Sequence, residues 1–193
     1  VVLMSVYKND NPEHLKLSTE SILNQTNQEF LLLIGVDGVV SDGLSEVLHG
    51  YEDDARVRVF WFKENRGLTA VLNNLLEEGK KMQPAYIARM DADDISKTDR
   101  FEKQVKYLEA HHELEVIGGA IEEMEYDGKL NGKVIRYPLT HDECFRFFAT
   151  RNPLAHPAVM FRASFFNKVP SYNASYKKNQ DTELWYRAFK AGC

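Results

Sequence analysis

Apolar residues in the first half of the chain occur in short runs of strand length, separated by amphipathic stretches. The predicted strands are residues 1–7, 30–36, 56–62 and 86–90. A helix is predicted to begin at Asn11-Pro12, because Asn caps helices and Pro suits the first turn. Over residues 67–79, Leu and Val recur three and four positions apart, and Gly79 is expected to end this second helix. Strands that alternate with helices predict a mostly parallel sheet covered on both faces.

The second half of the chain has a mixed pattern. Its predicted elements are a helix at 100–111, strands at 116–124 and 134–137, a helix at 140–148, a strand at 158–161 and a helix at 182–190. Asp127-Gly128 favours a hairpin turn between the first two of these strands. Thr140 and Glu143 have the spacing of a capping box. The aromatic cluster at 145–148 is expected in the core, with contact to a lipid-linked acceptor as the alternative. Together the two halves predict one α/β domain.

Composition places the chain among ordinary globular domains. It has 193 residues, 44% of them hydrophobic, and 24 Lys plus Arg against 29 Asp plus Glu, for a net charge of −5. A mildly acidic domain has no overall attraction for nucleic acid. Cys144 and Cys193 are too few for a disulfide framework and lack zinc-site spacing. The longest apolar run, residues 30–34, is too short to span a membrane. Both chain ends fall in patterned segments, so a short N-terminal and a longer C-terminal segment are expected beyond them.

Three acidic groups fall at positions where open α/β sheets bind ligands. Asp37 follows the second strand, the run 91–94 (Asp-Ala-Asp-Asp) follows the fourth, and Asp181 precedes the last helix. Crowded carboxylates raise one another's pKa, and Mg²⁺ or Mn²⁺ neutralises them well. Asp-x-Asp at a strand end therefore suggests a nucleoside diphosphate site. The alternative is that Asp93 and Asp94 simply cap the helix that follows.

Several common phosphate and hydrolase motifs are absent from the sequence. It contains no G-x-G-x-x-G after a strand, no G-x-x-x-x-G-K-[ST] and no G-x-S-x-G. Dinucleotide enzymes, P-loop NTPases and serine hydrolases therefore receive little support. Arg89 and Arg151 are interpreted as surface or ion-pair residues in preference to phosphate ligands.

Six ordered blocks of the chain resemble family 2 glycosyltransferases with the GT-A fold. The blocks are Ser5-Val6-Tyr7, Ser21-Ile22-Leu23-Asn24-Gln25-Thr26 with Val36-Asp37-Gly38, Asn65-Arg66-Gly67-Leu68 with Leu72-Asn73, Arg89-Met90-Asp91-Ala92-Asp93-Asp94, His156-Pro157-Ala158-Val159-Met160-Phe161-Arg162, and Gln180-Asp181-Thr182-Glu183-Leu184-Trp185. The branch most similar builds bacterial exopolysaccharide, capsule and lipopolysaccharide, of the amylovoran-synthesis type. The resemblance covers essentially the whole chain and implies one catalytic domain, with a nucleotide-sugar-binding half at 1–94 and an acceptor-side half at 95–193.

The resemblance implies a donor site in the first half of the chain. Asp37 would contact the base, with Ser5 and Tyr7 packed against it, and Asn73 would belong to the same nucleotide-sugar site. Asp91 would face the ribose or the diphosphate. The donor implied is a nucleoside diphosphate sugar, with UDP as the expected nucleotide.

It also implies the metal and the acceptor side. Asp93 would bind Mn²⁺ or Mg²⁺, with Asp94 nearby. Asp181 would be the general base, a role that suits single displacement with inversion. Gln180 and His156 would lie on the acceptor side, although His156 is equally interpreted as a packed, hydrogen-bonded residue. The acceptor implied is a saccharide or lipid-linked saccharide at the cytoplasmic face of the membrane, with peripheral association.

The chain departs from the family pattern at two points. Gln180 stands where Glu is usual, and the Q-x-x-R-W element of processive synthases is absent, which favours addition of a single sugar. Two other functions stay open. A sugar nucleotidyltransferase is disfavoured because residues 8–12 lack its Gly-rich basic loop. A module that binds nucleotide sugar without turnover is the second.

Overall fold

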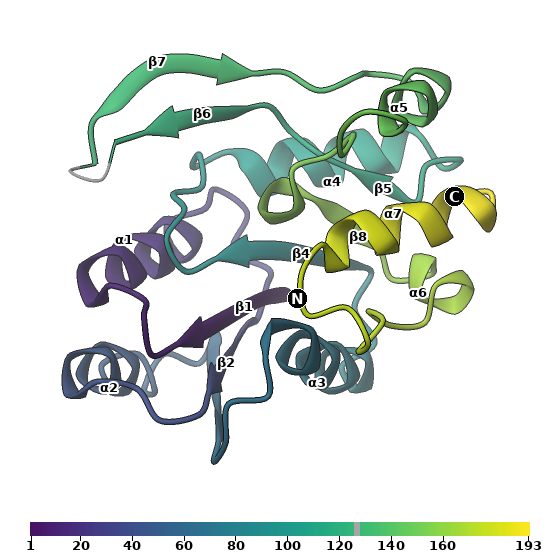
Figure 1. Cartoon of the computed structure of the whole chain (residues 1–193). Coiled ribbons are helices and arrows are strands. Elements are labelled where there is room, and N and C mark those ends of the chain that lie inside the picture. Colours follow the sequence, from purple (N-terminus) through teal and green to yellow (C-terminus); the bar gives the residue numbers. More distant parts are fainter. Residues whose placement is uncertain (126–127) are drawn as a thin grey trace.

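The computed structural model describes residues 1–125 and 128–193 and shows an α/β sandwich (Figure 1). The strands are β1 (Val2–Tyr7), β2 (Leu32–Asp37), β3 (Val57–Phe62), β4 (Tyr86–Asp91), β5 (Val116–Ile117), β6 (Ile121–Met124), β7 (Leu130–Ile135) and β8 (Met160–Arg162). The helices are α1 (Pro12–Leu23), α2 (Asp42–His49), α3 (Leu68–Lys81), α4 (Arg100–Ala110), α5 (His141–Phe148), α6 (Phe165–Lys168) and α7 (Gln180–Lys190), with a 3₁₀ turn at His156–Ala158.

The main sheet has the strand order β3-β2-β1-β4-β8-β5. β1 to β4 are parallel, whereas β8 runs antiparallel to both β4 and β5. β6 and β7 form a separate antiparallel hairpin. The predicted mostly parallel sheet with a mixed second half is therefore confirmed. Asp127 of the predicted hairpin turn lies outside the described residues.

Helices cover both faces of the sheet, because its strands carry apolar side chains on both faces. One core packs α1, α2 and α4 against the sheet, and its strand residues include Met4, Val6 and Met90. The other core packs α3, α6 and α7 against the opposite face, where Leu3 and Ile87 point. Residues of odd number in β1 and β4 thus share the face covered by α3 and α7 (Figure 1).

A glycine in β2 lets α3 approach the sheet closely. A Cβ added at Gly35 would lie 2.4 Å from Cγ1 of Val71, well inside van der Waals contact. The close packing of α3 brings its N-terminus to the carboxyl end of β2, where the predicted donor site lies.

Several predicted element boundaries were wrong. α3 continues through Gly79 to Lys81, because Gly79 packs against Val1 and Leu33 instead of ending the helix. The predicted strand at 158–161 begins only at Met160, after the 3₁₀ turn. α2 was not predicted, although Ser41 caps it by accepting from the amide of Leu44 (3.3 Å).

The aromatic residues of α5 do not lie in the core as expected. The capping box of Thr140 and Glu143 is confirmed. However, none of the eight residues of α5, all of them described, is buried, and Phe145 is 59% exposed. The helix lies at the edge of the domain, so its apolar side contacts Phe189 only partly.

Candidate functional site

Four of the predicted site residues meet at the carboxyl ends of three adjacent strands. In the parallel register, Tyr7 pairs with Asp37 across β1 and β2, and Ser5 pairs with Asp91 across β1 and β4. Ser5 is partly buried between its neighbours, whereas Tyr7 is 42% exposed. The sheet topology thus brings together at one edge residues that lie up to 86 positions apart in the sequence.

Asp37 holds the loop that leads into α3. Its side chain is only 3% exposed, and its two carboxylate oxygens accept the amide N–H of Arg66 (2.6 Å) and of Gly67 (2.9 Å). The side-chain amide of Asn65 donates to the Asp37 carbonyl (3.2 Å). Gly67 has a φ of +85°, a backbone conformation that residues other than Gly rarely adopt. Asp37 therefore shapes the rim of the site, and its contact with a nucleotide base stays a prediction.

Arg89 and Asp91 form an ion pair at the end of β4. Arg89 is 1% exposed, and its guanidinium donates to Oδ1 of Asp91 and to the carbonyls of Leu3 (3.1 Å) and Met90. Of the two roles predicted for Arg89, a surface residue or an ion-pair residue, the structure shows the ion pair. A buried guanidinium needs a paired carboxylate. The pair thereby fixes one oxygen of Asp91, whose side chain is partly accessible.

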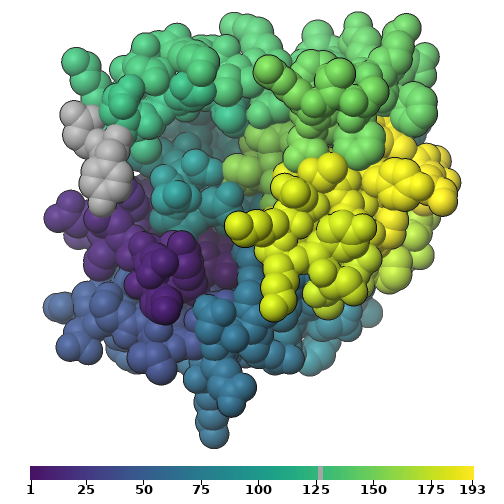
Figure 2. Space-filling view, in the orientation of Figure 1, coloured from purple at the N-terminus to yellow at the C-terminus, as the bar shows by residue number. Residues whose placement is uncertain are grey.

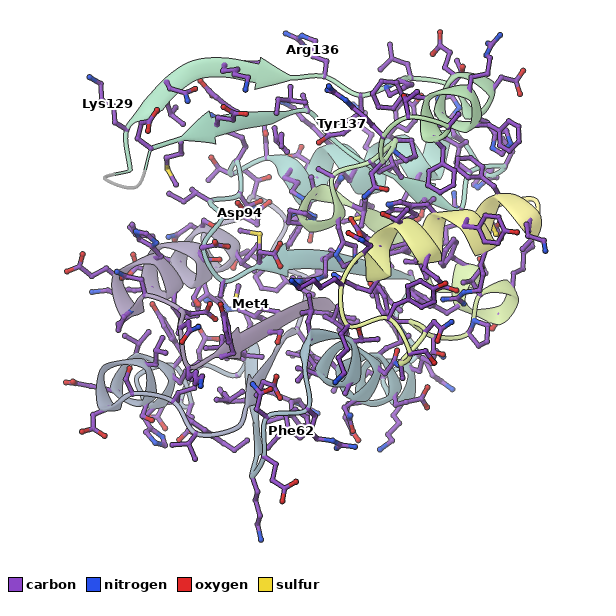
Figure 3. All side chains as sticks on the ribbon, viewed as in Figure 1. Met4, Phe62, Asp94, Lys129, Arg136 and Tyr137 are labelled. Atoms are coloured by element: carbon purple, nitrogen blue, oxygen red, sulfur yellow. The ribbon has the colours of Figure 1, made fainter. Side chains whose placement is uncertain are left out.

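Asp93 and Asp94 lie in a loop and not at a helix start. In this fully described stretch no helix begins until α4 at Arg100, and the residue at the N-cap of α4 is Asp99. The alternative that Asp93 and Asp94 cap a following helix is therefore wrong. Figure 3 shows Asp94 projecting from this loop, between β4 and the hairpin of β6 and β7.

The end of α1 clamps the loop that carries these aspartates. The buried side chain of Gln25 donates to the carbonyls of Ser21 (3.0 Å) and Lys97 (2.8 Å) and accepts the amide of Phe101 (3.0 Å). The amide of Ser96 donates to Oγ of Ser21 (3.0 Å). One of the sequence blocks that carried the family resemblance, residues 21–26, thus acts by holding the loop at residues 92–99.

A fourth carboxylate, that of Asp10, lies near those of Asp91, Asp93 and Asp94. It was not predicted from the sequence. Burial, followed by the negative charges of Asp91 and Asp93, raises the pKa of Asp94 to about 6. Burial also raises the pKa of Asp10 to about 6, with Asp93 and Asp91 adding to the rise and the amide N–H of Tyr7 opposing it. Asp10 lies in the loop after β1, so the strand-end rule that found Asp37 and Asp91 could have found it.

The donor atoms of this cluster fit a hard divalent cation that also binds a diphosphate. They are carboxylate oxygens, which Mg²⁺ and Mn²⁺ prefer, and they repel one another without a cation. Among the described residues, no three His, Cys, Asp or Glu side chains are close enough to form a complete protein cage for a metal. One or two carboxylates together with substrate phosphates would have to supply the ligands.

Asp181 lies in the first turn of α7, next to Gln180, where the helix dipole favours a carboxylate. Nδ2 of Asn152 donates to Oδ2 of Asp181 (2.7 Å), and Oγ1 of Thr182 donates to Oδ1 of Asn152 (2.9 Å). Asn152 was not predicted, because no local pattern links it to a residue 29 positions away.

The buried hydroxyl of Tyr172 is within electrostatic reach of both Asp91 and Asp181. Tyr172 is buried, which raises the pKa of its hydroxyl; Arg89 opposes this rise, and the charges of Asp91 and Asp181 add to it. The charges of both carboxylates thus act on one hydroxyl, and Tyr172 belongs to the core on the face of the sheet covered by α3 and α7.

His156 and Asn73 both serve to hold Tyr172. Nε2 of His156 lies 2.9 Å from the Tyr172 hydroxyl, and burial followed by the charge of Arg89 lowers the pKa of His156 well below its usual value. His156 is buried, so of its two interpretations the structure supports the packed, hydrogen-bonded one. The side-chain amide of Asn73 donates to the backbone carbonyl of Tyr172 (2.9 Å) and accepts the backbone N–H of Tyr172 (2.8 Å). We therefore leave Asn73 out of the proposed donor site.

Two hollows are lined by residues between Pro138 and Thr182. One of about 350 Å³ is lined by Phe148, Ala149, Thr150, Arg151, Asn152, Asn179 and Thr182. The other, of about 630 Å³, lies beside α5 and includes none of the predicted site residues. In the space-filling view, the surface recedes between the purple end of β1, the teal loop after β4 and the yellow start of α7 (Figure 2). Among the described helices, none has both the length and the apolar character needed to cross a bilayer.

The sequence comparisons identify glycosyltransferases. The family model described as Glycosyl transferase family 2 matches residues 1–169. The amylovoran biosynthesis glycosyltransferase AmsE of Erwinia amylovora is 33% identical over 191 residues, covering 99% of this chain and 70% of the relative. The UDP-Gal:alpha-D-GlcNAc-diphosphoundecaprenol beta-1,3-galactosyltransferase of Escherichia coli is 28% identical over 192 residues, covering 100% of this chain and 68% of the relative.

The structural comparisons show the same fold at low sequence identity. S. aureus TarS 1-349 in complex with UDP-GlcNAc matches with a TM-score of 0.73 and 15% identity, over 98% of this chain and 53% of that one. The mannosyltransferase PcManGT from Pyrobaculum calidifontis, in complex with GDP-Man and Mn2+, matches with a TM-score of 0.67 and 12% identity, over 97% and 51%. The chain thus spans about half the length of these two solved structures. The expected GT-A fold is confirmed.

Proposed function

Because the chain belongs to glycosyl transferase family 2, we propose that it moves one sugar from a nucleoside diphosphate sugar to a saccharide or lipid-linked saccharide. The product is part of a bacterial surface polysaccharide, and the anomeric configuration inverts. The observation that carries this proposal is the register that brings Ser5, Tyr7, Asp37 and Asp91 together at the carboxyl ends of three adjacent strands.

The donor side consists of the ends of β1, β2 and β4. Tyr7 and Asp37 stand in register where the base would lie. Asp91, held by Arg89, faces the ribose or diphosphate, and Asp93 with Asp94 supplies carboxylate oxygens for Mn²⁺ or Mg²⁺. When bound, such a cation stabilises the negative charge that develops on the leaving diphosphate.

Asp181 is the general base. It accepts the proton of the acceptor hydroxyl while that oxygen forms a bond to the anomeric carbon. The bond from this carbon to the diphosphate oxygen breaks, and its electron pair leaves with the nucleoside diphosphate. A base opposite the leaving group favours one displacement with inversion and contributes roughly 10²–10⁴-fold. Gln180, next to the base, lies on the acceptor side.

UDP is the nucleotide of the proposed donor, and the acceptor is lipid-linked or a growing saccharide. Support comes from two names: one relative uses UDP-Gal and a GlcNAc carried on diphosphoundecaprenol, and one solved structure holds UDP-GlcNAc. Such an acceptor lies at the cytoplasmic face of the membrane, where this protein would associate peripherally.

The first test is calorimetric titration with UDP, GDP, CDP and dTDP, each with Mn²⁺ and with chelator. We expect metal-dependent binding of UDP. Replacing Asp93→Ala should abolish the metal dependence, whereas the exposed Asp53→Ala control should not. Equal affinity of Asp93→Ala and wild type in Mn²⁺ would remove Asp93 from the metal site.

The second test measures turnover, as UDP released from UDP-galactose or UDP-GlcNAc with a synthetic GlcNAc-diphosphate-lipid acceptor. Asp181→Asn should lower kcat by about 10²-fold or more while UDP affinity survives. Unchanged kcat in Asp181→Asn would remove this residue from the base role. UDP binding without turnover of any sugar would favour the binding module. Pyrophosphate release from UTP and a sugar 1-phosphate would favour the nucleotidyltransferase.

A further inference from the structure

Asn152 joins the candidate base to the helix that carries it. It lies in the segment between α5 and the 3₁₀ turn, and its side-chain amide reaches the first turn of α7. Nδ2 donates to Oδ2 of Asp181 at 2.7 Å, the short distance of a charge-assisted hydrogen bond. Oδ1 of the same amide accepts a hydrogen bond from the Thr182 hydroxyl (2.9 Å).

The chemistry of the partners fixes which way this amide points. An ionised carboxylate only accepts hydrogen bonds, so the amide atom that faces Asp181 must be Nδ2. Oδ1 therefore faces Thr182, whose hydroxyl rotates to donate to it. With both ends satisfied, the amide has one orientation, and Oδ2 of Asp181 is held relative to the backbone of α7.

We propose that Asn152 is a positioning residue for proton transfer: it holds Oδ2 of Asp181 and leaves Oδ1 to take the proton of the acceptor hydroxyl. This inference rests on the proposed function, in which the acceptor O–H bond breaks to Asp181 as the new bond to the anomeric carbon forms. Without Asn152, the carboxylate can rotate about its side-chain bonds, and the aligned fraction falls.

A hollow opens beside this amide, although Asp181 itself does not line it. Asn152 and Thr182 both line the cavity of about 350 Å³, together with Asn179 and Arg151. A cavity of this size lies within the range of small-molecule sites. The polar atoms that orient the base are therefore next to open space on the acceptor side, and the donor-side carboxylates lie on other elements.

The test compares three variants by steady-state kinetics, using UDP release with the synthetic GlcNAc-diphosphate-lipid acceptor. Asn152→Ala should lower kcat by about 10- to 100-fold, the loss expected for one strong hydrogen bond in the transition state. Asn152→Asp keeps the size of the side chain but puts a second carboxylate against Asp181, so kcat should fall at least as far. Thr182→Val removes only the hydroxyl that fixes the amide and should have a smaller effect.

The controls separate positioning from folding. The KM for the donor sugar, the calorimetric affinity for UDP and the melting temperature should stay near wild type in all three variants. Asn173→Ala is the matched control, since Asn173 also contacts α7 but bonds Glu183 (3.3 Å) instead of the base; its kcat should change less than about twofold.

A double mutant decides whether Asn152 acts through Asp181. In an Asp181→Asn background, adding Asn152→Ala should cost little further activity, because the group it positions is gone. Wild-type kcat in Asn152→Ala, or a loss accompanied by weaker UDP binding, overturns the positioning role while leaving the proposed function intact. Wild-type kcat in Asp181→Asn overturns the base assignment itself and, with it, this inference.

Discussion

Replacing Gln25→Leu should loosen the donor site although Gln25 lies behind it. The buried side chain of Gln25 serves three backbone groups: the carbonyls of Ser21 and Lys97 and the amide of Phe101. Leu has similar size but satisfies none of them. A net loss of about 1 kcal/mol for each bond gives about 3 kcal/mol of unfolding free energy. For a domain of this size, that corresponds to a fall in melting temperature of about 6–12 °C.

The assay combines thermal unfolding with titration of UDP in Mn²⁺. Because the loop that bears Asp93 and Asp94 loses its tether to α1, affinity should fall about tenfold, or about 1.4 kcal/mol. Asn24→Leu is the control, since this exposed residue is the neighbour of Gln25 at the end of α1. A Gln25→Leu variant that melts within about 2 °C of wild type and binds UDP equally well would refute the clamp.

Three further predictions follow from the same structure. First, Asp94 has a raised pKa of about 6 in the folded protein, so the folded state binds its proton more tightly than the unfolded chain and loses stability as the pH rises from about 4 to 6. Metal-free Asp94→Asn should therefore melt above wild type at pH 7, and the difference should close at pH 4. Second, Gly35→Ala should cost about 1–3 kcal/mol by denaturant unfolding, and Val71→Ala should restore part of that loss. Third, Asp37→Asn should unfold about 1–2 kcal/mol more easily, because its amide nitrogen cannot accept the N–H of Gly67.

Local pattern predicted most of the fold, and its failures have a physical cause. Strands β1 to β4 and helices α1 and α3 are apolar or periodic enough to be recognised without their partners. The end of α3 was misjudged because Gly79 reads locally as a stop, whereas packing against Val1 and Leu33 makes a missing side chain useful inside the helix. The exposed aromatics of α5 were misplaced because apolar character alone does not say where a domain has its edge.

In the candidate site, too, local pattern predicted some residues and missed the contacts that hold them. The strand-end carboxylates could be found because parallel strands carry their carboxyl ends to one edge, so chain order predicts spatial order. Two contacts that hold other parts of the site could not be predicted: Asn152 with Asp181 and Gln25 with Lys97 join residues 29 and 72 positions apart. A sequence block that resembles a family need not touch the ligand. Residues 21–26 contribute through a clamp on the loop at 92–99, so the resemblance pointed to the right site while only the structure gave those residues a role.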